Sequence, residues 1–500
     1  MEKQALEWII RELLKGREDI EKIKRETTLK FSLSRMPRNS EILALFPKNK
    51  LTKKIKKILF RKPSRTASGV TPIALMIKPE SSCRWGCIYC PRTHKAPKSY
   101  TGEEPAALRA RGAHFDPIMQ IRNRLKQYEI QGHPTDKCEV IIMGGTFLAM
   151  DKKYKEFFVK SIYDTLNQKK SRSILHAKKL NERAKHRVVG LTIETRPDVC
   201  IPYIKEMLDF GATRVELGVQ NPDNRIYEKV NRGHTVKEVV DSTTALKNAA
   251  YKIVYHIMLG LPGSNPRKDI EIFKTLFSDE RFQPDMLKIY PTLVIPGTEL
   301  YELYKEGKYT PYSSELAAEV IAQAYRYIPE YARVMRIQRD IPANLISTGV
   351  KKSNLRELVE KRAKEIGKVW EIRAREPRTK NIRVDKSKLF RKDYKASRKK
   401  EIFLSYEDED RENIFGFVRL RIGEIGLIRE LHVYGGEAEI GKSGEIQHKG
   451  IGKKLMHEAE EIAKKEFGLE KMRVMSGAGV REYYYNLKYE TREPYVEKLL

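Results

Sequence analysis

Cysteine is scarce in this chain of 500 residues, which has five: Cys83, Cys87 and Cys90 lie close together, whereas Cys138 and Cys200 stand alone. So few and so unevenly placed cysteines exclude a disulfide framework of the kind that stabilises small secreted domains. Long apolar runs are also missing, and none approaches the roughly 18 residues that a membrane helix needs. The first ten residues, MEKQALEWII, mix charged and apolar side chains and lack the apolar core of a signal peptide. We therefore expect a cytoplasmic globular protein that does not enter a membrane.

Acidic residues are few relative to basic ones, with 67 Asp and Glu against 98 Lys and Arg and a net charge of +31. This excess favours a polyanionic partner such as nucleic acid, although a heavily charged solvated surface would also account for it. Residues 35–65 carry eleven Lys or Arg against one acidic residue, Glu41. Within them Leu51, Ile55, Ile58 and Leu59 fall at helical spacing, which predicts a basic amphipathic helix. Such a helix could meet RNA or a membrane surface, and we favour tRNA or another RNA. The candidate RNA-binding residues are Lys53, Lys54, Lys56, Lys57, Arg61 and Lys62.

Short apolar runs rich in β-branched residues alternate with helical stretches between about residues 71 and 310. The runs are IALMIKP, EVIIMGG, VVGLTIETRP, TRVELGVQ, KIVYHIMLGLPG and MLKIYPTLVIP. This alternation predicts six parallel strands in a partial (β/α)6 TIM-like barrel, with the chemistry at the carboxyl ends of the strands.

The pattern changes after about residue 400, where longer, alternating strands precede a helix from about residue 450. We expect a separate C-terminal α+β domain there. A stretch at 373–400 holds thirteen basic and three acidic residues and reads as part of a linker. The predicted organisation is a basic N-terminal region at 1–70, a barrel at 71–315, a basic linker region at 316–398 and the α+β domain at 399–500.

The three clustered cysteines form Cys-x3-Cys-x2-Cys in the loop after the first predicted strand, a spacing that lets three thiolates converge on one metal centre. Three thiolates on a 4Fe-4S cluster leave one iron open, and an open iron can chelate S-adenosylmethionine. The alternative is a structural zinc ion with His94 as its fourth ligand. We favour the iron–sulfur cluster, because the loop lies at the catalytic end of the predicted barrel.

With Gly144 and Gly145 after the second strand, this cysteine motif resembles the radical S-adenosylmethionine superfamily. The resemblance implies that Cys83, Cys87 and Cys90 hold the cluster and that Gly144 and Gly145 contact S-adenosylmethionine.

The C-terminal segment RELHV, followed by QHKGIG, resembles the GNAT acetyltransferases, in which a strand precedes a Gln-x-x-Gly-x-Gly turn that opens a helix. Small residues in such a turn let backbone N–H groups approach a pyrophosphate at a helix N-terminus. Tyr483 and Tyr484 fall where GNAT enzymes place a tyrosine near the thioester, although aromatic core residues would look the same.

A radical S-adenosylmethionine barrel joined to a GNAT domain resembles the family of the catalytic subunit of Elongator, the tRNA uridine carboxymethyl synthases. The resemblance covers nearly the whole chain and includes RTASGV, SYTGEEP, IIMGGTF, TIETRPD, NRGHTV, LKIYPTLVI, QRDIP, NLRELV, FLSYED and RELHVYG. It implies that a 5′-deoxyadenosyl radical takes hydrogen from the methyl of acetyl-CoA. The resulting carbon radical would add to carbon 5 of the wobble uridine, and thioester hydrolysis would yield 5-carboxymethyluridine.

Lys288, in the sixth predicted strand, would point into the barrel, where it could contact cofactor or substrate, because a lysine that points inward near a strand end seldom lacks a role. It is a catalytic candidate together with Tyr483 and Tyr484. The resemblance to the known families implies the remaining site residues. The implied contacts of acetyl-CoA are Lys137, Glu430, Leu431, His432, Val433, Gln447, Gly450, Ile451, Gly452, Lys453 and Tyr484.

The chain departs from the family pattern in three places. Family members commonly have more residues between the first two cysteines and Pro-Gly-Gly after the third, whereas Pro91, Arg92 and Thr93 follow here. No cysteine follows Cys200, which excludes a cysteine-based zinc site in the linker region. The usual glycine before the last tyrosine is Lys488, a change that bears on the local turn.

Two rival functions differ in class from this one. A protein lysine acetyltransferase would use the barrel only as a scaffold, and a tRNA-binding module would have inactive centres. The expected partners are tRNA and an external electron donor. The sequence leaves open a homodimer or partner subunits.

Overall fold

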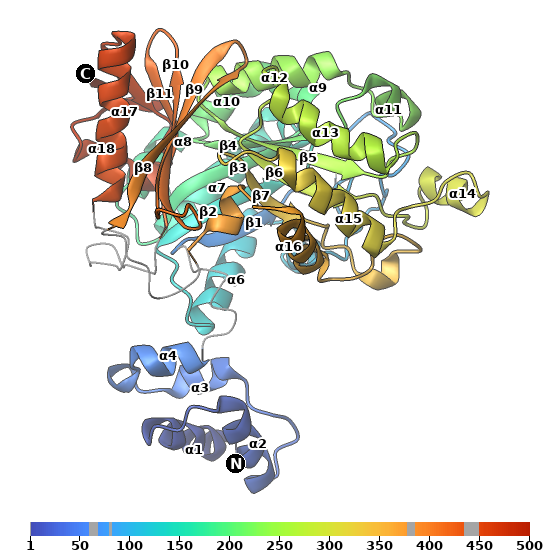
Figure 1. Cartoon of the computed structure of the whole chain (residues 1–500). Helices are drawn as coiled ribbons and strands as arrows, with labels where there is room; N and C mark the ends of the chain where they lie inside the picture. The colour runs from blue at the N-terminus through green and yellow to red at the C-terminus, as the bar shows by residue number, and fades with distance from the viewer. Residues whose placement is uncertain (1, 60–68, 80–82, 378–385, 435–449) are drawn as a thin grey trace.

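The structure is a computed structural model, and it describes residues 2–59, 69–79, 83–377, 386–434 and 450–500. Three parts follow one another along the chain: a group of N-terminal helices, a sheet surrounded by helices, and a second sheet with one long helix (Figure 1). Among the described residues, no helix combines the length and the apolar character that crossing a membrane requires.

The central sheet has seven parallel strands, and neighbours in sequence are neighbours in the sheet. The strands are β1 (Thr71–Met76), β2 (Lys137–Met143), β3 (Arg187–Thr195), β4 (Arg214–Gln220), β5 (Lys252–Leu259), β6 (Met286–Pro291) and β7 (Arg333–Ile337). The first six coincide with the predicted strands, so the partial barrel is confirmed. Because the strands are parallel, their carboxyl ends all lie at one edge of the sheet.

Helices cross from each strand to the next and bury the outer face of the sheet (Figure 1). They are α5 (Pro105–Gly112), α6 (Pro117–Ile130), α7 (Lys152–Asn167), α8 (Ile174–Asn181), α9 (Pro197–Cys200), α10 (Ile204–Asp209), α11 (Asn224–Lys229), α12 (Val236–Asn248), α13 (Pro266–Ser278), α14 (Glu299–Lys305), α15 (Ser314–Ala324) and α16 (Leu355–Ile366). Local sequence starts several of them: Thr235 and Glu238 form a capping box at α12, and Asn265 caps α13 just before Pro266.

The region 316–398, predicted as a basic linker, contains more regular structure than a linker. Most of α15, all of β7 and all of α16 lie in it, and β7 pairs with β6 as the seventh strand of the barrel sheet. The strand is short and reads RVMRI, in which two arginines flank the apolar residues. Because this stretch is basic, its sequence pattern did not indicate the edge strand β7.

The second sheet has the order β13-β14-β12-β11-β10-β9-β8 and is antiparallel apart from the pair β11 and β12. Its strands are β8 (Lys388–Ala396), β9 (Lys399–Glu407), β10 (Ile414–Ile422), β11 (Gly426–Val433), β12 (Lys471–Val474), β13 (Glu490–Arg492) and β14 (Tyr495–Leu499). Helix α17 (Ile451–Phe467) packs its apolar stripe on this sheet, and the short α18 (Arg481–Tyr485) follows β12. The predicted α+β domain is confirmed.

The N-terminal helices are α1 (Glu2–Leu14), α2 (Ile20–Lys30), α3 (Asn39–Leu45) and α4 (Lys53–Leu59), and they project from one end of the molecule (Figure 1). Helix α4 is the predicted basic amphipathic helix. Its Ile55 and Leu59 are buried in a small core with residues of α1, α2 and α3. Because Ile55 and Leu59 are covered, the apolar face of α4 packs inside the protein rather than on a membrane, which favours the RNA alternative.

Seven short 3-10 segments complete the described elements: η1 (Lys48–Lys50), η3 (Phe147–Ala149), η4 (Ile201–Tyr203), η5 (Tyr325–Tyr327), η6 (Ala343–Leu345), η7 (Ile372–Arg375) and η9 (Ala478–Val480). The last of these joins the two sheets. A Cβ on Gly477 would lie 2.3 Å from the carbonyl oxygen of Val189 in β3, so the C-terminal domain approaches the barrel backbone as closely as only glycine allows.

Candidate functional site

The cysteine loop follows β1 and lies at the carboxyl ends of the strands. Cys87 is buried, and Cys83 and Cys90 are half-buried. Backbone bonds hold the loop in place, because the N–H of Ile88 donates to the carbonyl of Val230 and the carbonyl of Ile88 accepts from the N–H of Leu300. These bonds fix the part of the loop between Cys87 and Cys90 against segments that follow β4 and β6.

Trp85 also holds the cysteine loop in place, through contacts with Asp198 and Gly233. Its indole N–H donates to Asp198 at 2.9 Å, and its ring lies against Gly233, where a Cβ would come within 2.3 Å of the ring. Gly233 also has a φ of +74°, a conformation that favours glycine. The glycine of the NRGHTV motif thus makes room for the loop.

A guanidinium stands next to the central thiol. Nη1 of the buried Arg232 lies 3.6 Å from Sγ of Cys87. Burial opposes ionisation of this thiol, but the charge and hydrogen bond of Arg232, together with Arg196 and Tyr89, outweigh burial and lower the pKa of Cys87. Burial instead raises the pKa of Cys90 to about 11. Arg232 therefore favours the thiolate form that a metal requires at Cys87.

The spacing of the thiols distinguishes between the two metal alternatives. In the described part of the chain, only Glu194, Glu216 and His256 form a group of three metal-binding side chains whose ligand atoms all lie within 4.8 Å of one another. At least one pair of the three thiols is therefore more than 4.8 Å apart. Ligands on one tetrahedral zinc ion lie about 3.8 Å apart, whereas each thiolate of a 4Fe-4S cluster binds its own iron. The wider spacing fits the cluster better than zinc.

The glycine pair after β2 lies at the same edge of the sheet. Gly144 has a φ of +124°, and its N–H donates to Glu194 of β3 at 3.1 Å. Beside Gly145, a Cβ would meet nothing within 4 Å, so the backbone there is open on one side. An open glycine backbone next to a carboxylate suits the amino acid end of S-adenosylmethionine.

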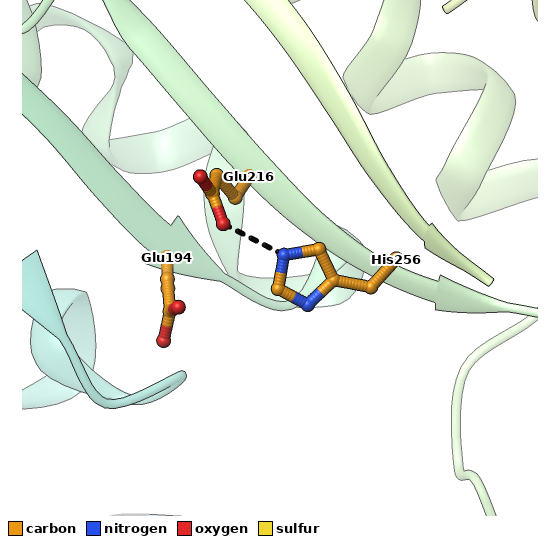
Figure 2. Close-up of side chains that lie close together, drawn as sticks. All are labelled: Glu194, Glu216 and His256. Atoms are coloured by element: carbon orange, nitrogen blue, oxygen red, sulfur yellow. Dashed lines mark hydrogen bonds and ion pairs between the residues drawn. The ribbon is translucent and has the colours of Figure 1, made fainter. Parts of the chain in front are cut away.

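Lys288 lies inside the barrel as predicted, on β6. Its ammonium binds Glu216 of β4. Glu216 also accepts a bond from His256 of β5, and Glu194 lies close by (Figure 2). Glu216 and His256 were missed by the sequence analysis. The available signal was a charged or polar residue in the middle of an apolar strand, in TRVELGVQ and in KIVYHIMLG.

The C-terminal domain has one pair of parallel neighbours, β11 and β12, whose pairing ends before β11 does. β11 pairs with β12 only from Gly426 to Ile428, so the rest of β11 diverges from its neighbour. That diverging end holds the four predicted residues Glu430, Leu431, His432 and Val433. A strand edge without a partner strand can pair with the amide groups of a pantetheine arm.

Helix α17 begins next to this strand end. Gly450 precedes it with a φ of +81°, and Ile451, Gly452 and Lys453 form its first turn. The first turn of a helix presents unpaired N–H groups, which suit the pyrophosphate of a CoA molecule. Lys453 is exposed there. Gln447, the first residue of the predicted turn, lies outside the described residues.

The two tyrosines take different places. A Cβ on Gly452 would lie 2.7 Å from the hydroxyl of Tyr483, so this hydroxyl sits at the start of α17, and it is buried without a hydrogen-bond partner in the described structure. Burial raises its pKa to about 12, so the hydroxyl stays protonated at neutral pH. Tyr484 packs into the core against Tyr489. Lys488 has a φ of +70°, a left-handed conformation that favours glycine, so the lysine adopts the turn geometry that a glycine would allow there.

The other predicted residues lie farther out. Lys137 is the first residue of β2 and pairs with Arg187, and a Cβ on Gly479 of η9 would touch Arg187. Lys137 therefore lies where the C-terminal domain meets the barrel. Of the RNA-binding candidates, Lys53, Lys54, Lys56 and Lys57 lie on α4, where Lys54 is exposed, while Arg61 and Lys62 lie outside the described residues.

Models of known families match four consecutive parts of the chain. These are the ELP3 N-terminal domain at 3–67, the Radical SAM superfamily at 77–276, the Radical_SAM C-terminal domain at 284–365 and the Acetyltransferase (GNAT) family at 367–488. The Radical SAM family implies a 4Fe-4S cluster and S-adenosylmethionine.

Curated relatives match nearly the whole length. The tRNA uridine(34) acetyltransferase of Methanocaldococcus jannaschii is 46% identical over 499 residues, covering 93% of this chain and 90% of that protein. Elongator complex protein 3 of Homo sapiens is 39% identical over 530 residues, covering 98% and 96%. A solved structure, the archaeal Methanocaldococcus infernus Elp3 with an N-terminal deletion (1–46), is 43% identical with a TM-score of 0.78, covering 87% of this chain and 100% of that one. The chain therefore belongs to the family of the tRNA uridine(34) acetyltransferases and Elongator complex protein 3.

Proposed function

We propose that this enzyme modifies the wobble uridine of tRNA, adding a carboxymethyl group from acetyl-CoA to carbon 5 of the base. One observation carries the proposal. A cysteine loop suited to an iron–sulfur cluster and a strand end suited to acetyl-CoA belong to two domains that are packed together in one chain. The names of the tRNA uridine(34) acetyltransferases supply position 34 of tRNA as the target, and a tRNA substrate supports a cytoplasmic enzyme.

Bound at the cysteine loop, a 4Fe-4S cluster with S-adenosylmethionine would supply hydrogen abstraction from the acetyl methyl, a step that ordinary base catalysis cannot achieve. Cys83, Cys87 and Cys90 would hold the cluster, with Arg232 keeping Cys87 ionised. Gly144 and Gly145 would bind S-adenosylmethionine. An external electron donor would supply the reducing equivalents.

Acetyl-CoA would bind between β11 and α17. Glu430 to Val433 would pair with the pantetheine arm, while Gly450, Ile451, Gly452 and Lys453 would bind the pyrophosphate, together with Gln447. Tyr483, at the start of α17, is the better placed of the two tyrosines to donate a hydrogen bond to the thioester, while Tyr484 would support it from the core. Lys137, at the domain boundary, would reach a CoA phosphate.

The end of β11 that holds Glu430 lies against the barrel. Glu430 is buried, and the charges of Arg419 and of Lys252, at the amino end of β5, lower its pKa against the effect of burial. The diverging strand thus faces the amino ends of the barrel strands. The basic α4, with Lys53, Lys54, Lys56 and Lys57, would bind tRNA.

The test is nucleoside mass spectrometry on tRNA incubated anaerobically with the reconstituted enzyme, a reductant, S-adenosylmethionine and acetyl-CoA deuterated at the methyl. We expect deuterated 5-carboxymethyluridine together with deuterated 5′-deoxyadenosine. Unmodified uridine with acetylated lysines on an added protein would instead favour a lysine acetyltransferase.

A further inference from the structure

Four ionisable side chains from four consecutive strands form one layer inside the barrel. They are Glu194 on β3, Glu216 on β4, His256 on β5 and Lys288 on β6. Glu194 and Glu216 are direct partners in the register of β3 and β4, and His256 and Lys288 are partners in that of β5 and β6. The layer is therefore built into the pairing of the strands, in the middle of the barrel.

Glu216 is the centre of the layer. Its Oε2 accepts a hydrogen bond from Nε2 of His256 at 2.7 Å (Figure 2). The same oxygen also binds the ammonium of Lys288. The side chain is fully buried, and its Oε1 has no hydrogen-bond partner among the described residues. Burial opposes ionisation, but the charge of Lys288 and the bond from His256 outweigh it and lower the pKa of Glu216. Burial likewise opposes the charge of Lys288, but Glu216 outweighs it and raises the pKa of that ammonium.

The other ionisable groups around the layer are held by their own partners. Tyr100 donates to Glu194 at 2.8 Å, and Gly144 donates to the same carboxylate. The ring of Tyr290 meets the ring of His256 edge to face, with centroids 5.5 Å apart. His256 is therefore fixed both by a bond to its Nε2 and by packing of its ring.

This arrangement sets the tautomer of the imidazole. An ionised carboxylate at Nε2 requires a proton on that nitrogen, so neutral His256 carries its lone pair on Nδ1. His256 is half-buried, in contrast to the fully buried Glu216. A carboxylate, an oriented imidazole and a nearby ammonium are the parts of a hydrolytic centre: a base for water and a cation for the oxyanion.

We propose that Glu216, His256 and Lys288 hydrolyse the CoA thioester that remains on the uridine after the carbon–carbon bond has formed. This inference rests on the proposed function. In that adduct the thioester carbonyl is separated from carbon 5 of the base by one methylene, so the carbonyl must lie in the same barrel interior that receives the base.

Nδ1 of His256 takes a proton from water while the water oxygen bonds to the carbonyl carbon, and Lys288 stabilises the negative oxygen. The carbon–sulfur bond then breaks, the proton passes from His256 to the leaving sulfur, and a carboxylic acid and the free thiol of CoA result. The acid loses its proton to solvent. The step consumes one water and needs no oxidant or reductant.

Two other uses of the layer fit less well. A divalent cation could find ligands on Glu194, Glu216 and His256, but the ammonium of Lys288 already binds the same oxygen of Glu216 as His256 does. His256 could instead take the proton from carbon 5 during formation of the adduct. That step would also require a one-electron oxidant, and it is an outcome of the test below.

The first experiment isolates hydrolysis from the radical chemistry. An anticodon stem-loop RNA carrying 5-carboxymethyluridine coupled as its CoA thioester is incubated with the enzyme without S-adenosylmethionine or reductant. We expect the wild type to release CoA and the His256→Gln variant to be at least about 100-fold slower, the usual contribution of a general base. The matched control is His457→Gln, which changes an exposed histidine of α17 and should behave as the wild type. No acceleration by the wild type, or equal rates in His256→Gln, would overturn the proposal.

The second experiment uses the complete reaction with deuterated acetyl-CoA. In His256→Gln, deuterated 5′-deoxyadenosine should form within about twofold of the wild-type amount while the product stops at the RNA–CoA thioester, which mass spectrometry resolves from the acid. Loss of the deuterated 5′-deoxyadenosine or of the adduct would place His256 in an earlier step. If the wild type makes neither the thioester adduct nor the acid, the proposed function fails, whereas the stem-loop assay still decides the hydrolytic role.

The third experiment reads the tautomer without any reaction. Nitrogen-15 NMR of labelled histidine, assigned by comparison with His256→Gln, should show a protonated Nε2 and an unprotonated Nδ1 in the wild type. Glu216→Gln removes the carboxylate and should shift this balance and slow stem-loop hydrolysis by roughly 10- to 1000-fold. A protonated Nδ1 in the wild type would exclude His256 as the base.

Discussion

At the scale of single residues, Cys87 is the thiol whose surroundings most favour a metal, because it is buried and faces the guanidinium of Arg232. We expect Cys87→Ala to lose the iron–sulfur cluster and to abolish uridine modification, since two thiolates no longer define the site. Binding of tRNA should change by less than about twofold, because α4 lies in a separate group of helices. Iron and sulfide analysis, nucleoside mass spectrometry and fluorescence anisotropy with labelled tRNA check the three statements.

Cys138→Ala is the matched control for this variant. Cys138 is also fully buried, but it lies in the core at the amino end of β2, away from the cysteine loop. It should keep the cluster and the activity. Retention of the cluster in Cys87→Ala would remove this residue from the proposed ligand set.

The residues of the site differ in how visible they are in the sequence. Cys83, Cys87 and Cys90 could be predicted because their spacing is local and their chemistry is specific. Glu216 and His256 could not, because each is one polar residue in an apolar strand, and their meeting depends on the register of β4 against β5. The sequence could not distinguish the roles of Tyr483 and Tyr484, because only the packing shows that Tyr483 faces the start of α17.

At the scale of elements, α4 combines a covered apolar face with lysines at 53, 54, 56 and 57. Changing these four lysines to Glu should weaken tRNA binding by more than tenfold and flatten its dependence on salt, since each phosphate contact contributes a slope of about one. Anisotropy titrations at several salt concentrations measure both effects. Circular dichroism should confirm that the helices remain folded.

The control for α4 places charge reversals elsewhere. Lys464 and Lys471 are exposed in the C-terminal domain, one near the end of α17 and the other at the start of β12. Their change to Glu should leave the salt slope unaltered. Equal affinity of the α4 variant and the wild type would exclude α4 from the RNA interface.

Elements with a strong periodic pattern could be predicted from the sequence, and those without one could not. The first six barrel strands are apolar runs followed by turn residues, which makes them visible. β7 is a five-residue strand with arginines at two positions, and it is recognisable only because it pairs with β6. A basic segment at the edge of a sheet has the same local composition as a linker.

At the scale of the whole molecule, a buried charge network joins the two sheets. Arg429 is the extra residue of a bulge in β11, because Arg419 pairs with Glu430 while Leu420 pairs with Ile428. Its guanidinium binds Asp285 of the barrel, with one contact of 2.8 Å, and also binds Glu401 of β9 at 3.0 Å. The network fixes the orientation of the proposed acetyl-CoA site relative to the barrel.

Lys247 of α12 adds a pH dependence to this network. Burial lowers its pKa to about 8, and the charge of Arg429 adds to the effect, while Asp285 and Glu401 oppose it. The pKa of a lysine in the unfolded chain is ~10.4, so between pH 8 and that value the unfolded chain binds more protons than the folded one. The free energy of unfolding therefore rises with pH over this range.

Lys247→Met removes this contribution. Denaturant unfolding should therefore show that the stability of the wild type relative to the variant increases from pH 8 to pH 10. In the control Lys205→Met, which changes an exposed lysine, the free energy of unfolding should depend on pH as it does in the wild type. The same dependence in Lys247→Met would contradict the assignment to Lys247.

Asp285 tests whether the network couples the domains. Its carboxylate accepts bonds from Arg429 and from the N–H of Ile253 and is fully buried, so Asp285→Asn leaves the guanidinium without its main counter-charge. Removing one partner of a buried ion pair typically costs about 3–5 kcal/mol, whereas replacing both partners with neutral groups costs far less. We therefore expect a large loss of stability in calorimetry for Asp285→Asn, a smaller loss for Asp285→Asn combined with Arg429→Met, and less than about 1 kcal/mol for the surface control Asp241→Asn. The double variant should nevertheless make little modified uridine, because neutral groups restore stability without fixing the orientation of the acetyl-CoA site. Full modification by the double variant would mean that the network serves stability alone.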